Sequence, residues 1–477
     1  MPTKKSPARD IQDFKRIKIL ATVGPATNDP QKIEALIAAG ANGIRLNFSH
    51  GTYEERREQI KWVRTASKKL GKPVAIVLDV QGPKIRLGDF EGEYQVRTGS
   101  RFTLEYGAEF DVHGGLLPTQ FDLSQKVKAG ERLLLADGAI QTEIKHVQDT
   151  QITVEAICDG VLTKRKGINL PDTDFGGDII TQKDWCDIEF GLNHDVDYIA
   201  LSFVQSAQDV QQLKKWLQQK KSEIKVIAKI ETEVATQHLE EITKASDAVM
   251  VARGDLAIET SPENVPIIQR KIIELCKEHN CVSIVATQML ASMVHNLQPT
   301  RAEVSDIATA AMLGADCLML SEETANGRYP TEAVKMMKRI IKHTQSEILP
   351  EPDLFRPEAS SQRDAISSAI VTLAHQIRAT AIVAETRSGA TAIHIATHRP
   401  AMPLIMVTNS EKVANQLALV YGGKSFTRPV SKQAATKLTN WLKSEGLLKS
   451  GDIIVTASGQ QPGVTGQTDT VKVRVLE

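Results

Sequence analysis

The sequence predicts an α/β protein: a (β/α)8 TIM barrel interrupted by a small β-barrel-like lid domain and followed by a C-terminal α/β domain. Three observations support this fold class. Short apolar runs alternate with amphipathic helix patterns, a long stretch after the third run lacks helix patterns, and a second α/β alternation follows a proline-rich segment.

The barrel prediction depends on the number of repeating units. The eight β-branched, apolar runs lie at residues 17–23, 43–48, 75–80, 198–203, 226–230, 248–252, 283–286 and 317–320. Helix patterns lie between them, for example at residues 30–39, 53–70, 209–219 and 266–279. Short buried strands that alternate with helices indicate a parallel sheet, and eight such units favour a closed barrel. An open doubly wound sheet is the alternative.

The stretch between the third and fourth runs reads as an inserted β-domain. Strand-like segments alternate there with Gly, Asp and Lys, at residues 101–106, 131–135, 140–144 and 152–156. A domain inserted in a βα-loop stands over the mouth of the barrel, where substrates bind, so we expect it to act as a lid.

The C-terminal part begins after the linker-like segment LPEPDLFRPEASSQ. Helix and strand patterns then alternate at residues 364–378, 381–385, 391–397, 403–407, 432–444, 452–457 and 471–475. The predicted domains are therefore an N-terminal arm at 1–14, a barrel at 15–84 and 181–348, a lid at 85–180 and an α/β domain at 349–477.

Composition narrows the class of protein. Lys plus Arg and Asp plus Glu both number 58, so the formal net charge is zero, and we expect neither nucleic acid nor an anionic membrane as a partner. The sequence contains no apolar run of about 18 residues, so we expect no membrane span. The basic start MPTKKSPARD is not followed by the apolar segment of a secretory signal. The five cysteines show no CxxC spacing, which predicts reduced thiols in a cytoplasmic protein.

Charged and polar side chains collect where the predicted barrel strands end. These ends meet at the face of a barrel that carries active sites. Buried strands seldom end in so much charge without a reason, because unpaired buried charge is costly. The segments RLNFSH, LDVQGPKIR, ALSF, AKIE, ARGD, ATQM and LSEET supply Arg45, Asn47, Ser49, Asp79, Lys84, Arg86, Lys229, Glu231, Arg253, Asp255, Thr287, Ser321 and Glu323.

These residue types suit a divalent cation and a multiply anionic substrate. Glu231 and Asp255 offer the hard oxygen ligands that Mg2+ or Mn2+ prefers, and Arg45 and Lys229 can hold phosphate oxygens. The chain has no Walker A motif and no glycine-rich kinase loop, so phosphoryl transfer would use another scaffold. For each charge taken alone, a structural salt bridge at the barrel rim is the alternative.

Several long segments resemble the pyruvate kinase family along nearly the whole chain. They are KILATVGPAT, IRLNFSHGTYEER, LDVQGPKIRLG, VIAKIET, VMVARGDLAIE, ATQML and PTRAEVSDIATAAMLGADCLMLSEETANGRYP. The resemblance implies a lid-bearing TIM barrel with a C-terminal effector domain, assembled as a homotetramer. It also implies a glycolytic, Mg2+-dependent enzyme that transfers the phosphoryl group of phosphoenolpyruvate to ADP, giving pyruvate and ATP.

The resemblance assigns roles to individual residues. It implies that the substrate is bound by Arg45, Lys229, Gly254, Asp255 and Thr287, and Mg2+ by Glu231 and Asp255. It implies that nucleotide phosphates are contacted by Asn47, His50, Arg86 and Lys183. His50 has a helix-capping role as its alternative. Ser321 and Glu323 match the family's proposed proton-relay positions, so the implied catalytic set is Lys229, Arg45, Thr287, Ser321 and Glu323.

Three positions depart from the family pattern: Ala257, Glu322 and Lys84. Many members carry Glu at the third position and require K+. The resemblance implies a monovalent-cation pocket formed by Asn47, Ser49, Asp79 and Val80. The Lys84 ammonium is a compact charge that can stand in place of K+, so we expect no K+ requirement. The alternative is a lysine that points outward at the lid hinge.

The C-terminal domain contains a candidate phosphate site in ETRSGATA. Thr386, Arg387, Ser388, Gly389 and Thr391 supply hydroxyls, a guanidinium and backbone N–H groups at a helix start, which favours phosphate. The segment PGVTGQTDT offers a loop that could close over the site, and an ordinary N-cap is the alternative. The family's effector site resembles this segment, so we expect activation by a phosphorylated metabolite.

Two other functions remain as alternatives. One is a Mg2+-dependent barrel enzyme that handles the pyruvate enolate, such as an aldol lyase, although such enzymes lack the lid and the residues matching Arg86 and Lys183. The other is a non-catalytic metabolite sensor, which loss of Lys229, Glu231 or Asp255 would favour; all three are present.

Overall fold

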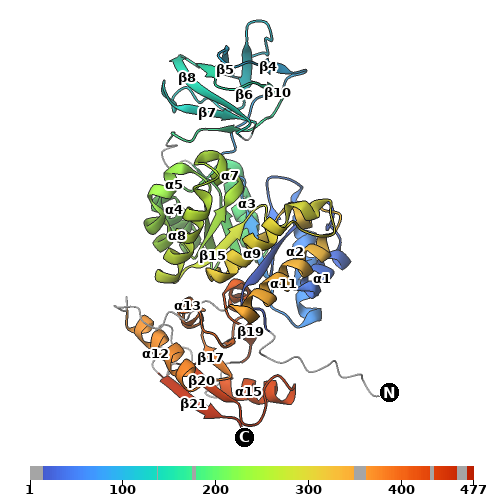
Figure 1. The fold of residues 1–477 in the computed structure, drawn as a ribbon, viewed down its shortest axis with the longest axis vertical. Helices are drawn as coiled ribbons and strands as arrows, with labels where there is room; N and C mark the ends of the chain where they lie inside the picture. Colours follow the sequence, from blue (N-terminus) through green and yellow to red (C-terminus); the bar gives the residue numbers. More distant parts are fainter. Residues whose placement is uncertain (1–13, 137, 174–178, 349–360, 430–433, 459–469) are drawn as a thin grey trace.

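Three domains follow one another along the long axis of the computed structural model (Figure 1). The structure describes residues 14–136, 138–173, 179–348, 361–429, 434–458 and 470–477. The predicted arm, apart from its last residue, and the linker segment at 349–360 lie outside this part of the chain. No helix within the described residues is both long and apolar enough to cross a membrane.

The central domain is the closed parallel barrel that the sequence predicts. Its strand order is β1-β16-β15-β14-β13-β12-β3-β2, with β2 pairing again with β1. The strands are β1 (Lys18–Val23), β2 (Gly43–Asn47), β3 (Ala75–Asp79), β12 (Tyr198–Leu201), β13 (Lys225–Ile230), β14 (Ala248–Ala252), β15 (Val282–Ala286) and β16 (Cys317–Leu320). Apart from two half-exposed residues each in β2 and β13, their residues are buried, as expected for a barrel covered by helices.

Most helices of the central domain cover the outside of the barrel. The helices are α1 (Pro30–Ala39), α2 (Tyr53–Leu70), α3 (Gln182–Asn193), α4 (Ala207–Gln219), α5 (Glu233–Gln237), α6 (Leu239–Ala245), α7 (Arg253–Glu259), α8 (Val265–Glu278), η2 (Ala291–Val294), α9 (Arg301–Met312), α10 (Glu322–Ala325) and α11 (Pro330–Glu347). Of these, α7, η2 and α10 follow strand ends and line a cavity there. Local sequence fixes several of their ends. Thr52 and Glu55 form a capping box at the start of α2, and Gly71, with a φ of 58°, ends that helix.

The inserted domain is a separate β-unit with its own core, as expected. Its sheets have the orders β11-β7-β8-β9-β5-β6 and β10-β4. The strands are β4 (Tyr94–Val96), β5 (Arg101–Tyr106), β6 (Leu116–Thr119), β7 (Arg132–Leu135), β8 (Ile140–Gln148), β9 (Gln151–Ala156), β10 (Gly160–Leu162) and β11 (Ile168–Asn169). The sequence patterns identified β5, β7, β8 and β9, and missed the shorter strands β4, β6, β10 and β11.

The lid touches the barrel through polar contacts. The Arg132 guanidinium lies 2.8 Å from the Glu233 carboxylate on α5. The Asn169 amide donates to Glu259 on α7 at 3.1 Å. Polar contacts of this kind are compatible with a lid that moves relative to the barrel.

The C-terminal domain has a five-stranded sheet with the order β19-β18-β17-β20-β21. Its elements are α12 (Gln362–Gln376), β17 (Ala381–Glu385), α13 (Ala390–Thr397), β18 (Leu404–Thr408), α14 (Glu411–Gln416), η3 (Leu417–Leu419), β19 (Lys424–Thr427), α15 (Ala434–Ser444), β20 (Ile453–Ser458) and β21 (Thr470–Val475). The sequence analysis missed α14, η3 and β19, because the polar and glycine-rich residues around 409–425 hide their short patterns.

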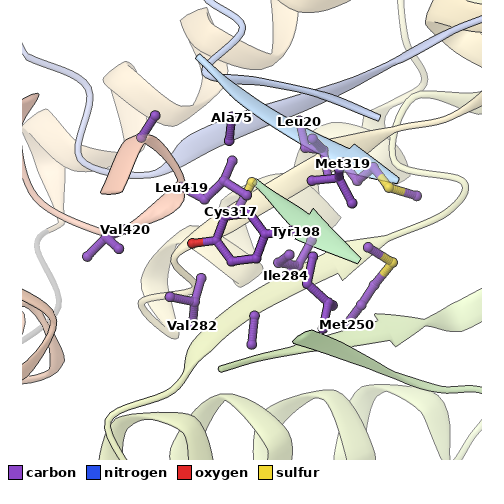
Figure 2. Packing of buried hydrophobic residues seen from close by; sticks show 14 of the residues in the cluster. Leu20, Ala75, Tyr198, Met250, Val282, Ile284, Cys317, Met319, Leu419 and Val420 are labelled. Carbon is purple, nitrogen blue, oxygen red and sulfur yellow. The ribbon is translucent and has the colours of Figure 1, made fainter. Parts of the chain in front are cut away.

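One of the missed segments seals the N-terminal end of the barrel. Figure 2 shows Leu419 and Val420 beside Ala75, Cys317 and Tyr198, and all five belong to one buried cluster. The Tyr198 hydroxyl donates to the Gln416 carbonyl at 2.8 Å. A Cβ added to Gly43 would lie 2.8 Å from a terminal methyl group of Leu419, so Gly43 lets this side chain pack closely against β2.

A buried ion pair strengthens the same contact. Arg399 of the C-terminal domain lies 2.7 Å from Asp316 of the barrel, and both side chains are almost fully buried. The guanidinium also donates to the Gly314 and Ala396 carbonyls, and Asp316 accepts from Ser283. These extra hydrogen bonds offset the cost of taking both charges out of water.

We predict that Arg399→Met destabilises the protein by about 3–5 kcal/mol, because it leaves the buried Asp316 carboxylate without a cation. Denaturant unfolding followed by tryptophan fluorescence measures this. Lys437→Met, at an exposed position of the same domain, is the control and should change stability by less than about 0.5 kcal/mol. Equal effects of the two substitutions would contradict the role of the pair.

Candidate active site

A cavity of about 500 Å³ lies among the C-terminal ends of the barrel strands. This is the face where the sequence places the active site. The lining residues are Arg45, Asn47, Asp79, Lys229, Glu231, Met250, Ala252, Gly254, Asp255, Thr287, Gln288, Ala291, Val294, His295, Met319, Ser321, Glu322 and Glu323. The structure therefore brings together ten of the predicted site residues from six strand ends.

Asp79 at the end of β3 joins the two cations of the cavity. Its carboxylate lies 2.6 Å from the Arg45 Nε on β2 and 3.3 Å from the Lys229 Nζ on β13. The Asp79 side chain is 2% exposed. Burial alone would raise the pKa of Asp79, but Arg45 and Lys229 outweigh that effect and lower it. Asp79 therefore stays ionised and fixes both cations.

Lys229 is enclosed by three oxygen-bearing side chains. Its Nζ lies 2.8 Å from Glu231 and donates to the Ser202 hydroxyl at 2.7 Å. Burial would lower the pKa of Lys229, but the carboxylates of Asp79 and Glu231 outweigh it and raise the pKa above its ordinary value. The residue is a fixed positive charge, suited to stabilising an anion rather than to acid–base catalysis at neutral pH.

Glu231 and Asp255 offer carboxylate oxygens from neighbouring strand ends. Burial raises the pKa of Glu231; Lys229 counteracts this rise and Asp255 adds to it. Among the described residues, no group of three or more His, Cys, Asp and Glu is arranged to hold a metal. Two carboxylates nevertheless fit Mg2+, which typically binds one or two protein carboxylates and takes its other ligands from substrate and water.

Gly254 and Thr287 meet across one wall of the cavity. The Gly254 N–H donates to the Thr287 hydroxyl at 2.8 Å, and Thr287 holds a φ of 68°. A left-handed β-branched residue is uncommon and is often found at functional sites. The Arg253 guanidinium pairs with Asp306 and donates to the Thr287 carbonyl. Arg253 therefore forms a structural salt bridge at the barrel rim, the alternative to a substrate contact.

Ser321 and Glu323 lie at the end of β16. Both Glu323 carboxylate oxygens accept backbone N–H groups, from Leu290 at 2.9 Å and Ser321 at 2.7 Å. The Ser321 hydroxyl is buried and has no hydrogen-bond partner among the described residues, although the residue lines the cavity. Glu323 therefore positions the loop, and Ser321 carries the uncommitted hydroxyl.

The predicted nucleotide residues form two groups. The Lys183 ammonium donates to the Phe48 carbonyl at 2.7 Å and pairs with Asp187 at 2.6 Å, beside Asn47 and His50. His50 is exposed, and its carbonyl accepts from Arg56. Arg86 stands apart at the lid hinge, where it donates to the Arg165 carbonyl at 3.2 Å.

Lys84 lies next to the cavity rather than in it. It lines a smaller cavity of about 20 Å³ with Asp255, Glu259 and Phe203. Among the described residues, no hydrogen bond or ion pair joins its ammonium to Asn47, Ser49 or Asp79. The Asn47 side chain accepts from the Ser49 N–H, and the Val80 carbonyl accepts from Ser202.

The candidate effector segment forms the turn between β17 and α13. The Gly389 N–H donates to the Thr386 hydroxyl at 3.0 Å, and Gly389 has a φ of 89° at the N-cap of the helix. Arg387 and Ser388 belong to the same turn, and Thr391 is mostly buried in the first turn of α13. Of the loop proposed to close over it, residues 462–469 lie outside the described residues.

The sequence analysis missed Ser202, Thr22 and Asp187. Ser202 belongs to the strand end ALSF, which carries no charge, and the Thr22 hydroxyl on β1 accepts a hydrogen bond from Arg45. Asp187 lies on a helix rather than at a strand end.

Among the departures from the family pattern, Glu322 lines the cavity, whereas Ala257 does not.

Family models match both major parts of the chain. The model described as "Pyruvate kinase, barrel domain" matches residues 14–334, and "Pyruvate kinase, alpha/beta domain" matches residues 364–474. A crystal structure of a pyruvate kinase from Cryptosporidium parvum superposes with a TM-score of 0.91 at 32% identity and covers 100% of both chains.

Curated relatives extend the match over nearly the full length. A pyruvate kinase of Thermotoga maritima is 39% identical over 96% of this chain and 98% of its own length. Pyruvate kinase 2 of a Synechocystis strain is 38% identical over 97% of this chain and 80% of its own. A pyruvate kinase of Clostridium acetobutylicum is 36% identical over 97% of this chain and 100% of its own length. The chain belongs to the pyruvate kinase family and is a phosphotransferase.

Proposed function

We propose that this chain transfers the phosphoryl group of phosphoenolpyruvate to ADP, in glycolysis, and that the 500 Å³ cavity is where it does so. The observation that carries the proposal is that Arg45, Lys229, Glu231 and Asp255 line one cavity. Arg45 binds the substrate phosphate, and the Gly254–Thr287 wall receives the substrate carboxylate.

The charge of the cavity supports a divalent cation, Mg2+ or Mn2+, at Glu231 and Asp255. The lining contains five carboxylates, on Asp79, Glu231, Asp255, Glu322 and Glu323, against two cations, on Arg45 and Lys229. A cavity with this excess of negative charge repels an anionic substrate unless cations enter with it. When bound, the metal supplies Lewis-acid stabilisation of the charge on the phosphoryl and enolate oxygens.

Lys229 stabilises the phosphoryl group in transfer. Phosphoryl transfer needs positioning and charge stabilisation more than a covalent partner. The contacts with Asp79, Glu231 and Ser202 hold the ammonium in place before substrate arrives, so little reorganisation is required in the transition state. The lid excludes water that would otherwise accept the phosphoryl group.

Protonation of the enolate completes the reaction. We assign the proton delivery to the Ser321–Thr287 side of the cavity, because the Ser321 hydroxyl is uncommitted while both Glu323 oxygens hold backbone N–H groups. Thr287 donates its own hydroxyl to the Ala286 carbonyl. Asn47, His50, Lys183 and Arg86 serve the nucleotide phosphates, with Arg86 brought closer by lid movement.

Replacing the fixed cation tests the catalytic assignment. Lys229→Met should lower kcat at least about a thousandfold with a modest change in KM, because the contact is made in the transition state. Lys225→Met, at the opposite end of the same strand, is the matched control. A near-normal kcat in Lys229→Met would rule out the assignment. Glu231→Gln should in addition raise the Mg2+ concentration needed for half-maximal activity.

We further propose that Lys84 makes K+ unnecessary. The cavity that it lines shares Asp255 with the substrate cavity, so its charge adjoins the substrate phosphate. An ammonium and K+ about 4 Å apart would repel by about 4 kcal/mol at an effective dielectric of about 20. In the family, the K+ pocket consists of residues matching Asn47, Ser49, Asp79 and Val80, and we propose that the Lys84 ammonium reaches this pocket when substrate is bound.

The K+ proposal predicts full activity of the wild type in K+-free buffer containing a large organic cation. Lys84→Glu should acquire a K+ requirement, because it removes the built-in charge and adds a carboxylate that a monovalent cation can offset. Activity measured against K+ concentration for both proteins decides the matter. A wild-type enzyme that is nearly inactive until K+ is added would falsify this proposal without affecting the catalytic one.

A phosphorylated metabolite is the proposed activator, bound at Thr386, Arg387, Ser388, Gly389 and Thr391. The left-handed Gly389 and the backbone N–H groups that begin α13 support phosphate binding at this turn. We also propose, from the family, that the enzyme is an allosteric homotetramer in the cytoplasm.

The activator proposal predicts that Ser388→Glu abolishes activation, because the added carboxylate repels phosphate. Initial rates at subsaturating phosphoenolpyruvate, with a panel of sugar phosphates and nucleoside monophosphates, measure the effect. Ser410→Glu, at the N-cap of α14 in the same domain, is the control and should retain activation. Activation that persists in Ser388→Glu, or no response of the wild type to the panel, contradicts the proposal.

A further inference from the structure

A second cavity, of about 290 Å³, lies at the junction between the barrel and the C-terminal domain. The barrel contributes the last turns of α2 and the turn that follows it. The C-terminal domain contributes α14, β19 and α15. The lining residues are Arg64, Ser67, Lys68, Gly71, Lys72, Pro73, Glu411, Ala414, Asn415, Lys424, Ser425, Phe426, Thr427, Arg428 and Trp441.

The charge of this junction cavity is strongly unbalanced. Five cationic residues line it, Arg64, Lys68, Lys72, Lys424 and Arg428, against the single carboxylate of Glu411. The chain as a whole has no net charge, so this excess is local. Cations in the last turn of a helix are common because they complement its dipole, and that explains Lys68 alone. It does not explain the cations on the turn after α2 and on β19.

Two of these cations are held in place by the fold. Arg428 stacks on the Trp441 ring at 4.7 Å and donates to the Thr427 carbonyl at 3.2 Å. Arg64 donates to the Val74 carbonyl and pairs with the buried Asp197, both at 2.8 Å. A guanidinium whose plane is fixed loses little conformational entropy when it binds an oxyanion.

The positive field continues beyond the cavity. Lys72 and Lys424 also line a neighbouring cavity with Lys15, Lys18 and Lys338. Burial lowers the pKa of Lys15, and the ammonium groups of Lys18, Lys338 and Lys72 lower it further. A counter-anion at the junction would relieve this mutual repulsion.

We propose that the junction cavity is a binding site for a compact phosphorylated anion, separate from the substrate cavity and from the turn at Thr386–Thr391. None of the residues of those two sites lines it. Its volume is at the low end for small-molecule sites, which favours a pyrophosphate or a sugar phosphate over a dinucleotide. Fixed guanidinium groups with flexible lysines around them suit phosphate oxygens.

The position of the site gives it a route to the active site. Pro73 leads directly into β3, which ends at Asp79, the carboxylate that fixes Arg45 and Lys229. On the other wall, α14 and β19 flank the segment that seals the bottom of the barrel. An anion held between the two walls therefore ties the junction together next to β3.

Calorimetric titration with inorganic pyrophosphate, in the presence of a chelator so that no divalent metal occupies the substrate cavity, tests the site. The test variant is Lys68→Gln/Arg428→Gln. The control is Lys69→Gln/Lys437→Gln, which removes the same charge from α2 and from the C-terminal domain at positions outside the cavity. Glucose 1-phosphate replaces pyrophosphate in a second series, to separate inorganic from sugar-linked phosphate.

We expect the test variant to bind pyrophosphate at least about tenfold more weakly than wild type, because two charge-assisted contacts are lost, whereas the control keeps wild-type affinity. The single variant Lys68→Gln, at an exposed position, should show an intermediate loss and guards against misfolding of the double variant. Equal affinities in test and control proteins, or no binding by the wild type, overturn the proposal.

Discussion

The active site depends on one buried carboxylate. Asp79 holds Arg45 and Lys229 together, although two cations so close would otherwise repel each other in a poorly solvated cavity. Strand pairing sets its position, because Asn47 of β2 and Ala200 of β12 are its register partners. A slip of one residue in either pairing would turn the carboxylate out of the cavity. Barrel closure is therefore a condition for the chemistry.

The opposite end of the barrel shows how that register is maintained. Leu419 and Val420 fill the N-terminal end, where Figure 2 shows them among side chains of several strands. The Arg399–Asp316 pair adds a contact that tolerates little displacement, because both groups are buried and fully hydrogen-bonded. The C-terminal domain thus closes the end of the barrel away from the active site.

Sequence patterns predicted the barrel and most of the candidate site because barrel chemistry collects at strand ends. Lys229 and Glu231 are two apart on one strand, so their shared direction follows from the backbone. The remainder depends on tertiary contacts. Ser202 has no charge to mark it, Arg399 and Asp316 are far apart in the chain, and the position of Lys84 depends on how the lid sits. The commitment of Glu323 to backbone N–H groups follows from loop geometry that no residue pattern encodes.

The two cavities illustrate how a chain without net charge can still bind anions in different ways. The substrate cavity has an excess of carboxylates, so an anionic substrate is attracted only together with divalent cations. The junction cavity has an excess of cations and attracts an anion without a metal. Binding at the first should thus be sensitive to free divalent cation, whereas binding at the second should be sensitive mainly to ionic strength. A phosphorylated metabolite that chelates the divalent cation would therefore oppose substrate binding while still being able to bind at the junction.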